Sequence, residues 1–150
     1  MDLSRDALGP ALASAGHDPA TPTTWLWEGV VPYLTRAEVE ATLAALAAAS
    51  APGSRLVVNY QAKSFLNSAL RRLFQLVLAL SRQPDPLRAE PWRSLWRPAD
   101  LAHLLARHGF RITSDSDLAT LAQGLDLPDA NTLSLRNGRV AVADLPPPGG

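Results

Sequence analysis

The chain has 150 residues, of which 47% are apolar and 19% are charged, so it is not a disordered protein and can form one domain with a core. Fourteen basic residues balance fourteen acidic ones, which argues against nucleic acid as a partner. The absence of cysteine excludes disulfides and thiolate sites and fits a cytoplasmic location. No apolar stretch is long enough for a membrane span, so we expect no membrane insertion.

The first third of the chain predicts a helix, a strand and a second helix. A short helix is expected over residues 10–15. The run TWLWEGVV, residues 24–31, is apolar and rich in tryptophan and valine, which predicts a strand buried on both faces. Thr35 and Glu38 then form a T-x-x-E capping box, and apolar residues follow at helical spacing to about residue 50.

The middle of the chain predicts a parallel strand pair followed by a long helix. Residues 54–60, SRLVVNY, form a second buried strand, and the helix between the two strands makes a βαβ unit. Residues 63–82 read as a helix that is apolar nearly all round in its second half. The proline-punctuated loop over 83–97 is longer than ordinary connections, so we expect it to be functional.

The last third of the chain continues the alternation of helices and strands. We expect a helix over 98–108, a strand over 110–115, a short helix over 118–123, and a hairpin turn at Asn137-Gly138 that leads into a fourth strand. The whole is an α/β domain over residues 1–145, with a mostly parallel sheet, a terminal antiparallel hairpin and a tail at 146–150.

One carboxylate, Glu28, interrupts the apolar run 24–31. A lone buried carboxylate costs several kcal/mol unless it is paired, so this residue is exposed, paired or used in binding. In open parallel sheets ligands bind beyond the carboxyl ends of the strands, and Gly29 lets a ligand approach the backbone closely there. Glu28 is therefore suited to a cationic ligand group such as an amine, or equally to an ion pair with an arginine at the sheet edge.

A set of short motifs occurs in a fixed order along the chain. It comprises Met1-Asp2-Leu3, the Glu28-Gly29 strand end, Tyr33 five residues after the glutamate, the Thr35 cap, Pro52-Gly53-Ser54-Arg55 and the segment EPWRSLWRPADLAHLLARHGFRI from residue 90. In order and spacing these motifs resemble the leucine carboxyl methyltransferase-like family of S-adenosylmethionine-dependent methyltransferases, including its bacterial branch. The resemblance spans nearly the whole chain.

The resemblance implies a cofactor, a reaction and a set of site residues. The cofactor would be S-adenosyl-L-methionine, with Glu28 and Gly29 at its methionine end and Asp2 and Leu3 at its adenine. Tyr33 would lie near the methyl acceptor; the alternative is that its ring packs on the core at the helix entry. The reaction would be O-methyl transfer to a small molecule or carboxylate. The fold would be the C-terminal half of a Rossmann-like class I methyltransferase.

The chain also departs from the family pattern, since it contains no Gly-x-Gly turn for the cofactor. It therefore corresponds to a truncated methyltransferase domain, explained by a start assigned too far downstream, a degraded gene or a second chain that completes the fold. Such a sheet has an open edge that invites self-association. The isolated chain is then expected to have little activity, and the alternative function is a non-catalytic interaction fragment that needs a second chain.

Other constellations carry less weight. The three histidines, His17, His103 and His108, lack the spacing of a metal site, and the last suits a helix C-terminus as a cation. No G-x-S-x-G elbow supports a hydrolase. Arginines interleave with Trp92 and Trp96 over residues 71–97, where the tryptophans belong either to a lid over the substrate or to the core.

Overall fold

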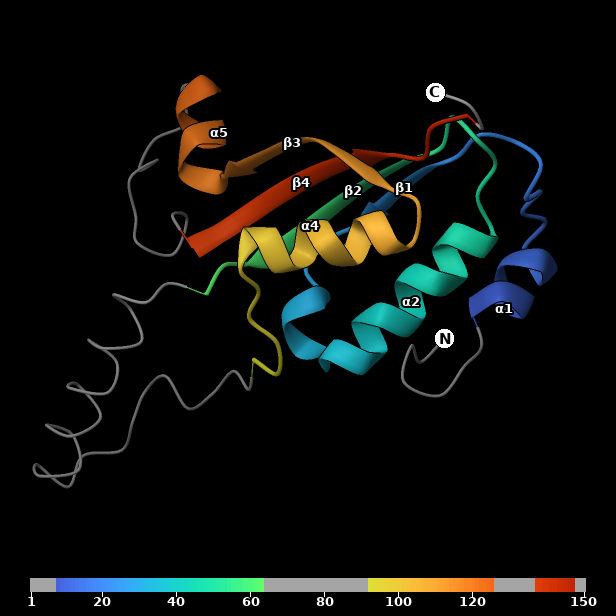
Figure 1. The fold of residues 1–150 in the computed structure, drawn as a ribbon, viewed down its shortest axis with the longest axis horizontal. Coiled ribbons are helices and arrows are strands. Elements are labelled where there is room, and N and C mark those ends of the chain that lie inside the picture. The colour runs from blue at the N-terminus through green and yellow to red at the C-terminus, as the bar shows by residue number, and fades with distance from the viewer. Residues whose placement is uncertain (1–7, 64–91, 126–136, 148–150) are drawn as a thin grey trace, which may run out of the picture.

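The computed structural model describes residues 8–63, 92–125 and 137–147, which fold around a four-stranded sheet (Figure 1). The strands are β1 (Thr24–Trp27), β2 (Arg55–Gln61), β3 (Arg111–Asp117) and β4 (Gly138–Asp144). The helices are α1 (Leu8–Ser14), the short 3-10 helix η1 (Val31–Tyr33), α2 (Arg36–Ala48), α4 (Pro98–Arg107) and α5 (Leu118–Gly124). The predicted α/β class is confirmed.

The sheet is mixed, with the order β1-β2-β4-β3. Strand β1 pairs with β2 in parallel, whereas β4 pairs antiparallel with both β2 and β3. The expectation of a mostly parallel sheet is thus only partly correct: β1, β2 and β3 run in one direction, but β4 enters between β2 and β3 in reverse. The predicted hairpin turn at Asn137-Gly138 is wrong in its position, because Gly138 is already the first residue of β4 and pairs with Gln61.

Strand β1 is shorter and more exposed than the sequence predicts. It ends at Trp27; of residues 28–31, which were expected to continue it, only Val31 belongs to another element, the first position of η1. Within the described residues β1 pairs only with β2, so it is an edge strand. Its Leu26 side chain is 70% exposed, which contradicts a strand buried on both faces. Burial of both faces requires cover on each side, and only the side of Trp27 has it here.

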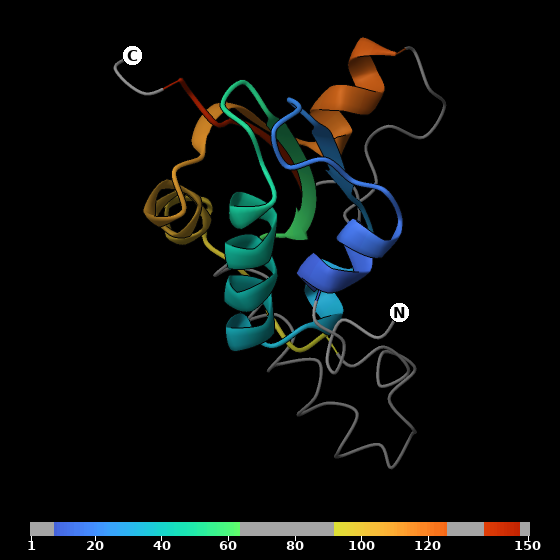
Figure 2. The same ribbon diagram turned by 90° about the vertical axis from the view of Figure 1, so that its right-hand side faces the viewer.

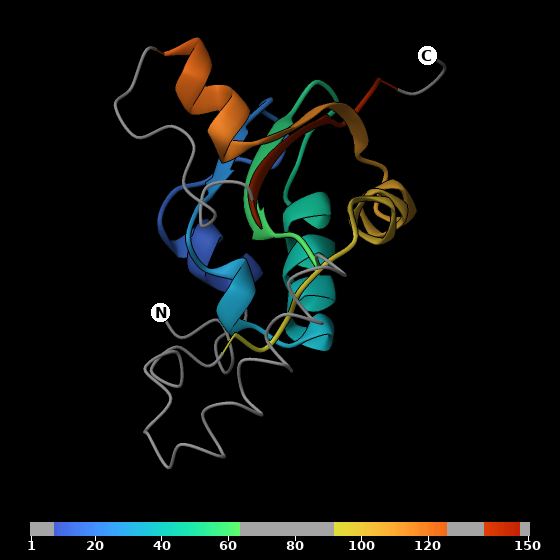
Figure 3. The same cartoon turned by 90° about the vertical axis from the view of Figure 1, so that its left-hand side faces the viewer.

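Helices α2 and α4 cover one face of the sheet, as the two side views show (Figures 2 and 3). The predicted capping box is confirmed, since Thr35 Oγ1 accepts from Glu38 N at 3.3 Å and Glu38 Oε2 accepts from Thr35 N at 2.6 Å. The core between helices and sheet is apolar throughout and includes Val39, Leu43, Leu46, Leu56, Val58, Leu101, Leu104, Leu105, Ala141 and Ala143.

The opposite face of the sheet carries an apolar row that α2 and α4 do not cover. Strand register places Leu26 beside Val57, and Val57 beside Val142. Leu26 is exposed, and both valines are only partly buried. Because successive residues of a strand face opposite sides, this row points away from the core formed by Leu56 and Val58. The second face of the sheet is therefore the less protected one.

The predicted helix over 98–108 is confirmed as α4, which has Pro98 in its first turn. Gly109 ends it with a φ of +85°, and His108 is the C-cap residue. Burial lowers the pKa of His108, and the charge of Arg107 lowers it further. The neutral imidazole is favoured, so this histidine does not act chiefly as a cation at the helix end.

Of two other predicted helices, one begins earlier than expected and one lies outside the described residues. Helix α1 begins at Leu8, so Pro10 is its third residue rather than its first. The helix expected over 63–82 and the first part of the loop over 83–97 lie outside the described residues. Among the helices that the structure describes, none has the length and apolar character needed to cross a membrane.

Candidate functional site

Glu28 lies directly beyond the carboxyl end of β1, as the sequence predicts, and it is exposed. Its carboxylate makes no hydrogen bond or ion pair with another described residue, so the alternative of an arginine partner at the sheet edge finds no support there. Gly29 follows with a φ of +70°, and a Cβ built on it would meet nothing within 4 Å. The chain thus turns sharply at an open position next to a solvated acid.

Tyr33 ends the short helix η1 and points its side chain outward. Val31 and Pro32 of the same turn are buried, whereas Tyr33 is 43% exposed. Tyr33 is thus not among the buried residues of the core, and its place near the methyl acceptor stays a prediction. The two buried residues hold the turn against the core.

Residues 92–96 run alongside η1 and join it to the end of β2. Arg93 N and Ser94 N donate to the Pro32 carbonyl at 2.7 and 3.2 Å. The buried Ser94 hydroxyl donates to the Val31 carbonyl at 2.9 Å and accepts from Trp96 Nε1 at 3.2 Å. Trp96 forms a parallel bridge with Ala62. The segment is therefore held at the carboxyl ends of β1 and β2.

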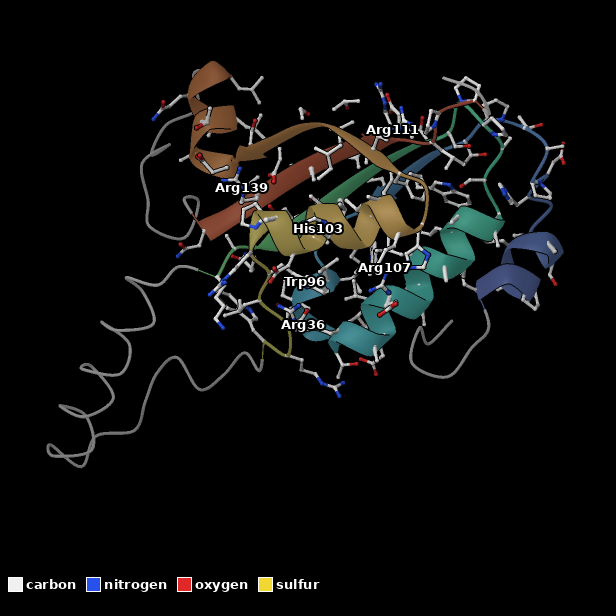
Figure 4. The ribbon with its side chains drawn as sticks, viewed as in Figure 1. Arg36, Trp96, His103, Arg107, Arg111 and Arg139 are labelled. Carbon is white, nitrogen blue, oxygen red and sulfur yellow. The ribbon has the colours of Figure 1, made fainter. Side chains whose placement is uncertain are left out.

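The two tryptophans of this segment have different environments. Trp96 is 3% exposed and belongs to the core, while Trp92 is 43% exposed. The Arg36 guanidinium lies over the Trp96 ring at 4.2 Å from its centre, which Figure 4 shows, and donates to the Leu95 carbonyl at 3.1 Å. The sequence left two alternatives for these tryptophans, a lid over the substrate or a place in the core. Trp96 lies in the core, and Trp92 faces solvent.

Arginines near this edge are paired with acids on α2 and α4. Arg36 lies 3.7 Å from Asp100, and Arg93 lies 3.6 Å from Glu38. At the far end of α4, away from this edge, Arg107 pairs with Glu40. In the described part of the chain these arginines are thus divided among carboxylates rather than gathered into a basic surface. Within the same residues, no cluster of histidines and acids could hold a metal ion.

A polar cluster that sequence analysis did not identify joins β2, β3 and β4. The Tyr60 hydroxyl donates to Asp115 at 2.7 Å, and Arg139 Nε donates to the same carboxylate at 2.9 Å. Burial, together with the bond to Asp115, raises the pKa of Tyr60 far above its usual value, so the phenol stays protonated at neutral pH. Figure 4 shows Arg139 at the start of β4. Only the insertion of β4 between its neighbours brings the three together.

The structure brings three of the five predicted site residues into one short stretch. Glu28, Gly29 and Tyr33 follow each other at the end of β1 and in η1. Asp2 and Leu3 lie outside the described residues, so their roles stay predictions. Trp92, which no spacing in the sequence connects to these residues, joins them through the backbone pairing of 92–94 with η1.

Known proteins similar to this chain are methyltransferases. The sequence profile of the leucine carboxyl methyltransferase family matches residues 1–47, a range that contains all five predicted site residues. A protein of Mycobacteroides abscessus assigned as an S-adenosyl-L-methionine-dependent methyltransferase is 32% identical over 146 residues, covering 87% of this chain and 45% of that protein. The chain is therefore similar to the leucine carboxyl methyltransferase family over residues 1–47, and to an S-adenosyl-L-methionine-dependent methyltransferase over most of its own length.

Solved structures agree with this family at the level of the fold. A methyltransferase structure from Thermobifida fusca superposes with a TM-score of 0.59 at 18% identity, over 95% of this chain and 52% of that one. Magnesium protoporphyrin IX methyltransferase from Synechocystis, solved with bound SAH, gives a TM-score of 0.54 at 16% identity, over 96% and 48%. The fold is thus Rossmann-like, of the class I methyltransferase type. The chain spans less than half the length of the curated relatives that it matches.

Ser94→Ala tests whether the 92–96 segment is fixed to η1. The change leaves the Trp96 indole N–H without its partner and removes one of the two donors to the Val31 carbonyl, and we expect a loss of about 1–3 kcal/mol in the free energy of unfolding. Urea denaturation measures this loss. The matched control is Ser114→Ala on β3, where the serine is exposed and the cost is expected to be within about 0.5 kcal/mol. Equal effects at the two serines would show that the segment is not held by Ser94.

Proposed function

We propose that this chain is part of an S-adenosylmethionine-dependent methyltransferase that transfers a methyl group to an oxygen of a small molecule, with a carboxylate as the favoured acceptor. The observation that carries the proposal is Glu28, an exposed acid without a described partner beyond the carboxyl end of β1. It stands in a chain whose relatives are assigned to this activity.

The residues at the β1 end fit the methionine end of the cofactor. Glu28 offers a carboxylate for an ammonium group, and the left-handed backbone at Gly29 leaves room for a ligand to approach. Asp2 and Leu3 are proposed to contact the adenine. When bound, S-adenosylmethionine supplies a sulfonium-linked methyl group that an acceptor oxygen takes by in-line displacement. A carboxylate acceptor loses no proton in this reaction, so the chain needs no general base.

The contribution of the protein is then mainly to position the two reactants. Well-oriented reactants can gain about 7–11 kcal/mol relative to reactants that meet in solution. Tyr33 is proposed to lie beside the methyl acceptor, since it is exposed a few residues beyond Glu28. The network of Ser94 and Trp96 holds η1 against the end of β2, which keeps Tyr33 in place relative to Glu28.

Glu28→Gln is expected to weaken S-adenosylmethionine binding in a protein extended upstream to the length of its relatives. Loss of a charged hydrogen-bond partner corresponds to about 1.5–3 kcal/mol, or roughly a tenfold to hundredfold rise in Kd. Isothermal titration measures the change. Glu40→Gln on α2 is the matched control, because that acid pairs with Arg107 away from the β1 end. Unchanged affinity in Glu28→Gln would assign the glutamate a structural role.

The 150-residue chain by itself is expected to bind the cofactor at least about tenfold more weakly than the extended protein, and to catalyse little methyl transfer. No Gly-x-Gly turn occurs in its sequence, so its cofactor contacts come from the β1 end and from Asp2 and Leu3. Ordering residues near a chain terminus costs roughly 1–2 kcal/mol each. Parallel titrations of the two proteins test this. Equal affinities would contradict it, and no binding by either protein would refute the proposed activity.

We also propose self-association as a second, non-catalytic property of the isolated chain. Strand β1 is an edge among the described strands, and Leu26 is 70% exposed on the sheet face opposite α2 and α4. Such an edge can pair with another polypeptide. The same edge supports the alternative of an interaction fragment that needs a second chain.

Leu26→Lys is expected to reduce this self-association, because a charge on an edge strand opposes pairing between chains. Light scattering over a concentration series measures the mean mass. Leu125→Lys is the matched control, since Leu125 is equally exposed but follows α5 at the β3 side of the sheet. A wild-type chain that stays monomeric at high concentration and unfolds cooperatively would rule the second property out.

A further inference from the structure

Two aromatic rings remain well exposed in the described part of the chain. Tyr33 and Trp92 are each 43% exposed, whereas the other described tyrosines, tryptophans and phenylalanines are buried or partly buried, namely Trp25, Trp27, Tyr60, Trp96 and Phe110. Aromatic side chains gain much of their stabilisation from burial, so exposed rings at a ligand-binding edge indicate a binding surface. The packing of the core therefore does not explain why these two rings are exposed.

The two residues come from distant parts of the sequence, and a hydrogen bond joins the backbones of their direct neighbours. The bond runs from Arg93 N to the Pro32 carbonyl and is 2.7 Å long. Trp92 directly precedes the donor residue, and Tyr33 directly follows the acceptor residue. Both are thus next to the same hydrogen bond, at the carboxyl edge of the sheet and a few residues beyond Glu28.

Both signs of charge occur near these residues, with Arg93 next to Trp92 and Glu28 five residues before Tyr33. The Arg93 side chain is 52% exposed and lies 3.6 Å from Glu38, a longer separation than a direct hydrogen bond. The Glu38 oxygen that faces it already accepts from Thr35 N at 2.6 Å and Thr35 Oγ1 at 2.8 Å. The Arg93 guanidinium is thus a half-exposed cation in a long ion pair, and it can approach a second anion.

We propose that Trp92 and Tyr33 bind the ring of an aromatic carboxylate, the methyl acceptor, with Arg93 as the nearest cation for its acid group. This inference rests on the proposed methyltransferase function and names its substrate class. The indole and phenol present flat apolar surfaces on which a planar ring can stack, and the fixed backbone of 92–94 keeps them in place. Trp92 is a substrate-binding and specificity-determining residue in this proposal.

The test uses 2-naphthoate and its saturated analogue decahydro-2-naphthoate as probes of the 150-residue chain, in ligand-observed NMR titrations. We expect 2-naphthoate to bind more tightly than the saturated acid. Trp92→Ala should weaken 2-naphthoate binding by about tenfold, which corresponds to about 1.4 kcal/mol. Trp92→Phe should restore most of the affinity, because it keeps a flat ring. Tyr33→Ala should weaken binding in the same direction.

Leu125→Ala is the matched control, an equally solvent-facing apolar side chain at the other side of the sheet, and it should leave the affinity unchanged. Thermal unfolding by circular dichroism verifies that the Trp92 variants remain folded. The proposal is overturned if Trp92→Ala binds 2-naphthoate as tightly as the wild type, if the saturated acid binds equally well, or if 2-naphthoate does not bind at millimolar concentration.

Titration of the upstream-extended protein with S-adenosylmethionine separates this inference from the function on which it rests. If the cofactor binds but 2-naphthoate does not, the result contradicts the proposal of an aromatic acceptor and leaves the proposed methyltransferase function in place. If 2-naphthoate binds in a way that depends on Trp92 but the cofactor does not bind, the result supports the aromatic binding site and contradicts the proposed methyltransferase function.

Discussion

Strand β2 is the element on which the rest of the structure depends. It pairs in parallel with β1 on one side and antiparallel with β4 on the other. Its Leu56, Val58 and Tyr60 are buried in the core. Because parallel strands end at the same edge, the pairing of β1 with β2 also brings Glu28 and the Ala62–Trp96 bridge to one edge. The candidate site is a consequence of that register.

Stability and binding are divided between the two sides of this edge. Toward the sheet, Ser94 and Trp96 are buried and hydrogen-bonded, and Arg36 covers the Trp96 ring. Toward solvent, Glu28, Tyr33 and Trp92 are exposed. A buried, satisfied layer beneath an exposed set of binding groups is the arrangement that preorganises a site, since the supporting residues do not have to move when a ligand binds.

Local patterns predicted individual elements well and their assembly less well. The Thr35–Glu38 capping box, α4 with Pro98 in its first turn, and the strand around Val58 follow from interactions within a few residues, and the structure contains each of them. An antiparallel fourth strand was predicted, but not its position between β2 and β3, because that position depends on pairing with β2 across nearly eighty residues of sequence. The apolar run 24–31 was predicted too long, since composition does not reveal that β1 is an edge.

The sequence by itself determined the α/β class, the family resemblance, and the position of Glu28 and Gly29 at a strand end, because these depend on residue order and local spacing. Only the tertiary structure decided which aromatic rings are exposed. Trp92 and Trp96 are chemically identical and four residues apart, yet one faces solvent and the other lies in the core. Backbone hydrogen bonds from Arg93 and Ser94 to Pro32 and from Trp96 to Gln61 link this segment to distant parts of the chain, and the Trp96 indole also donates to the buried Ser94 hydroxyl.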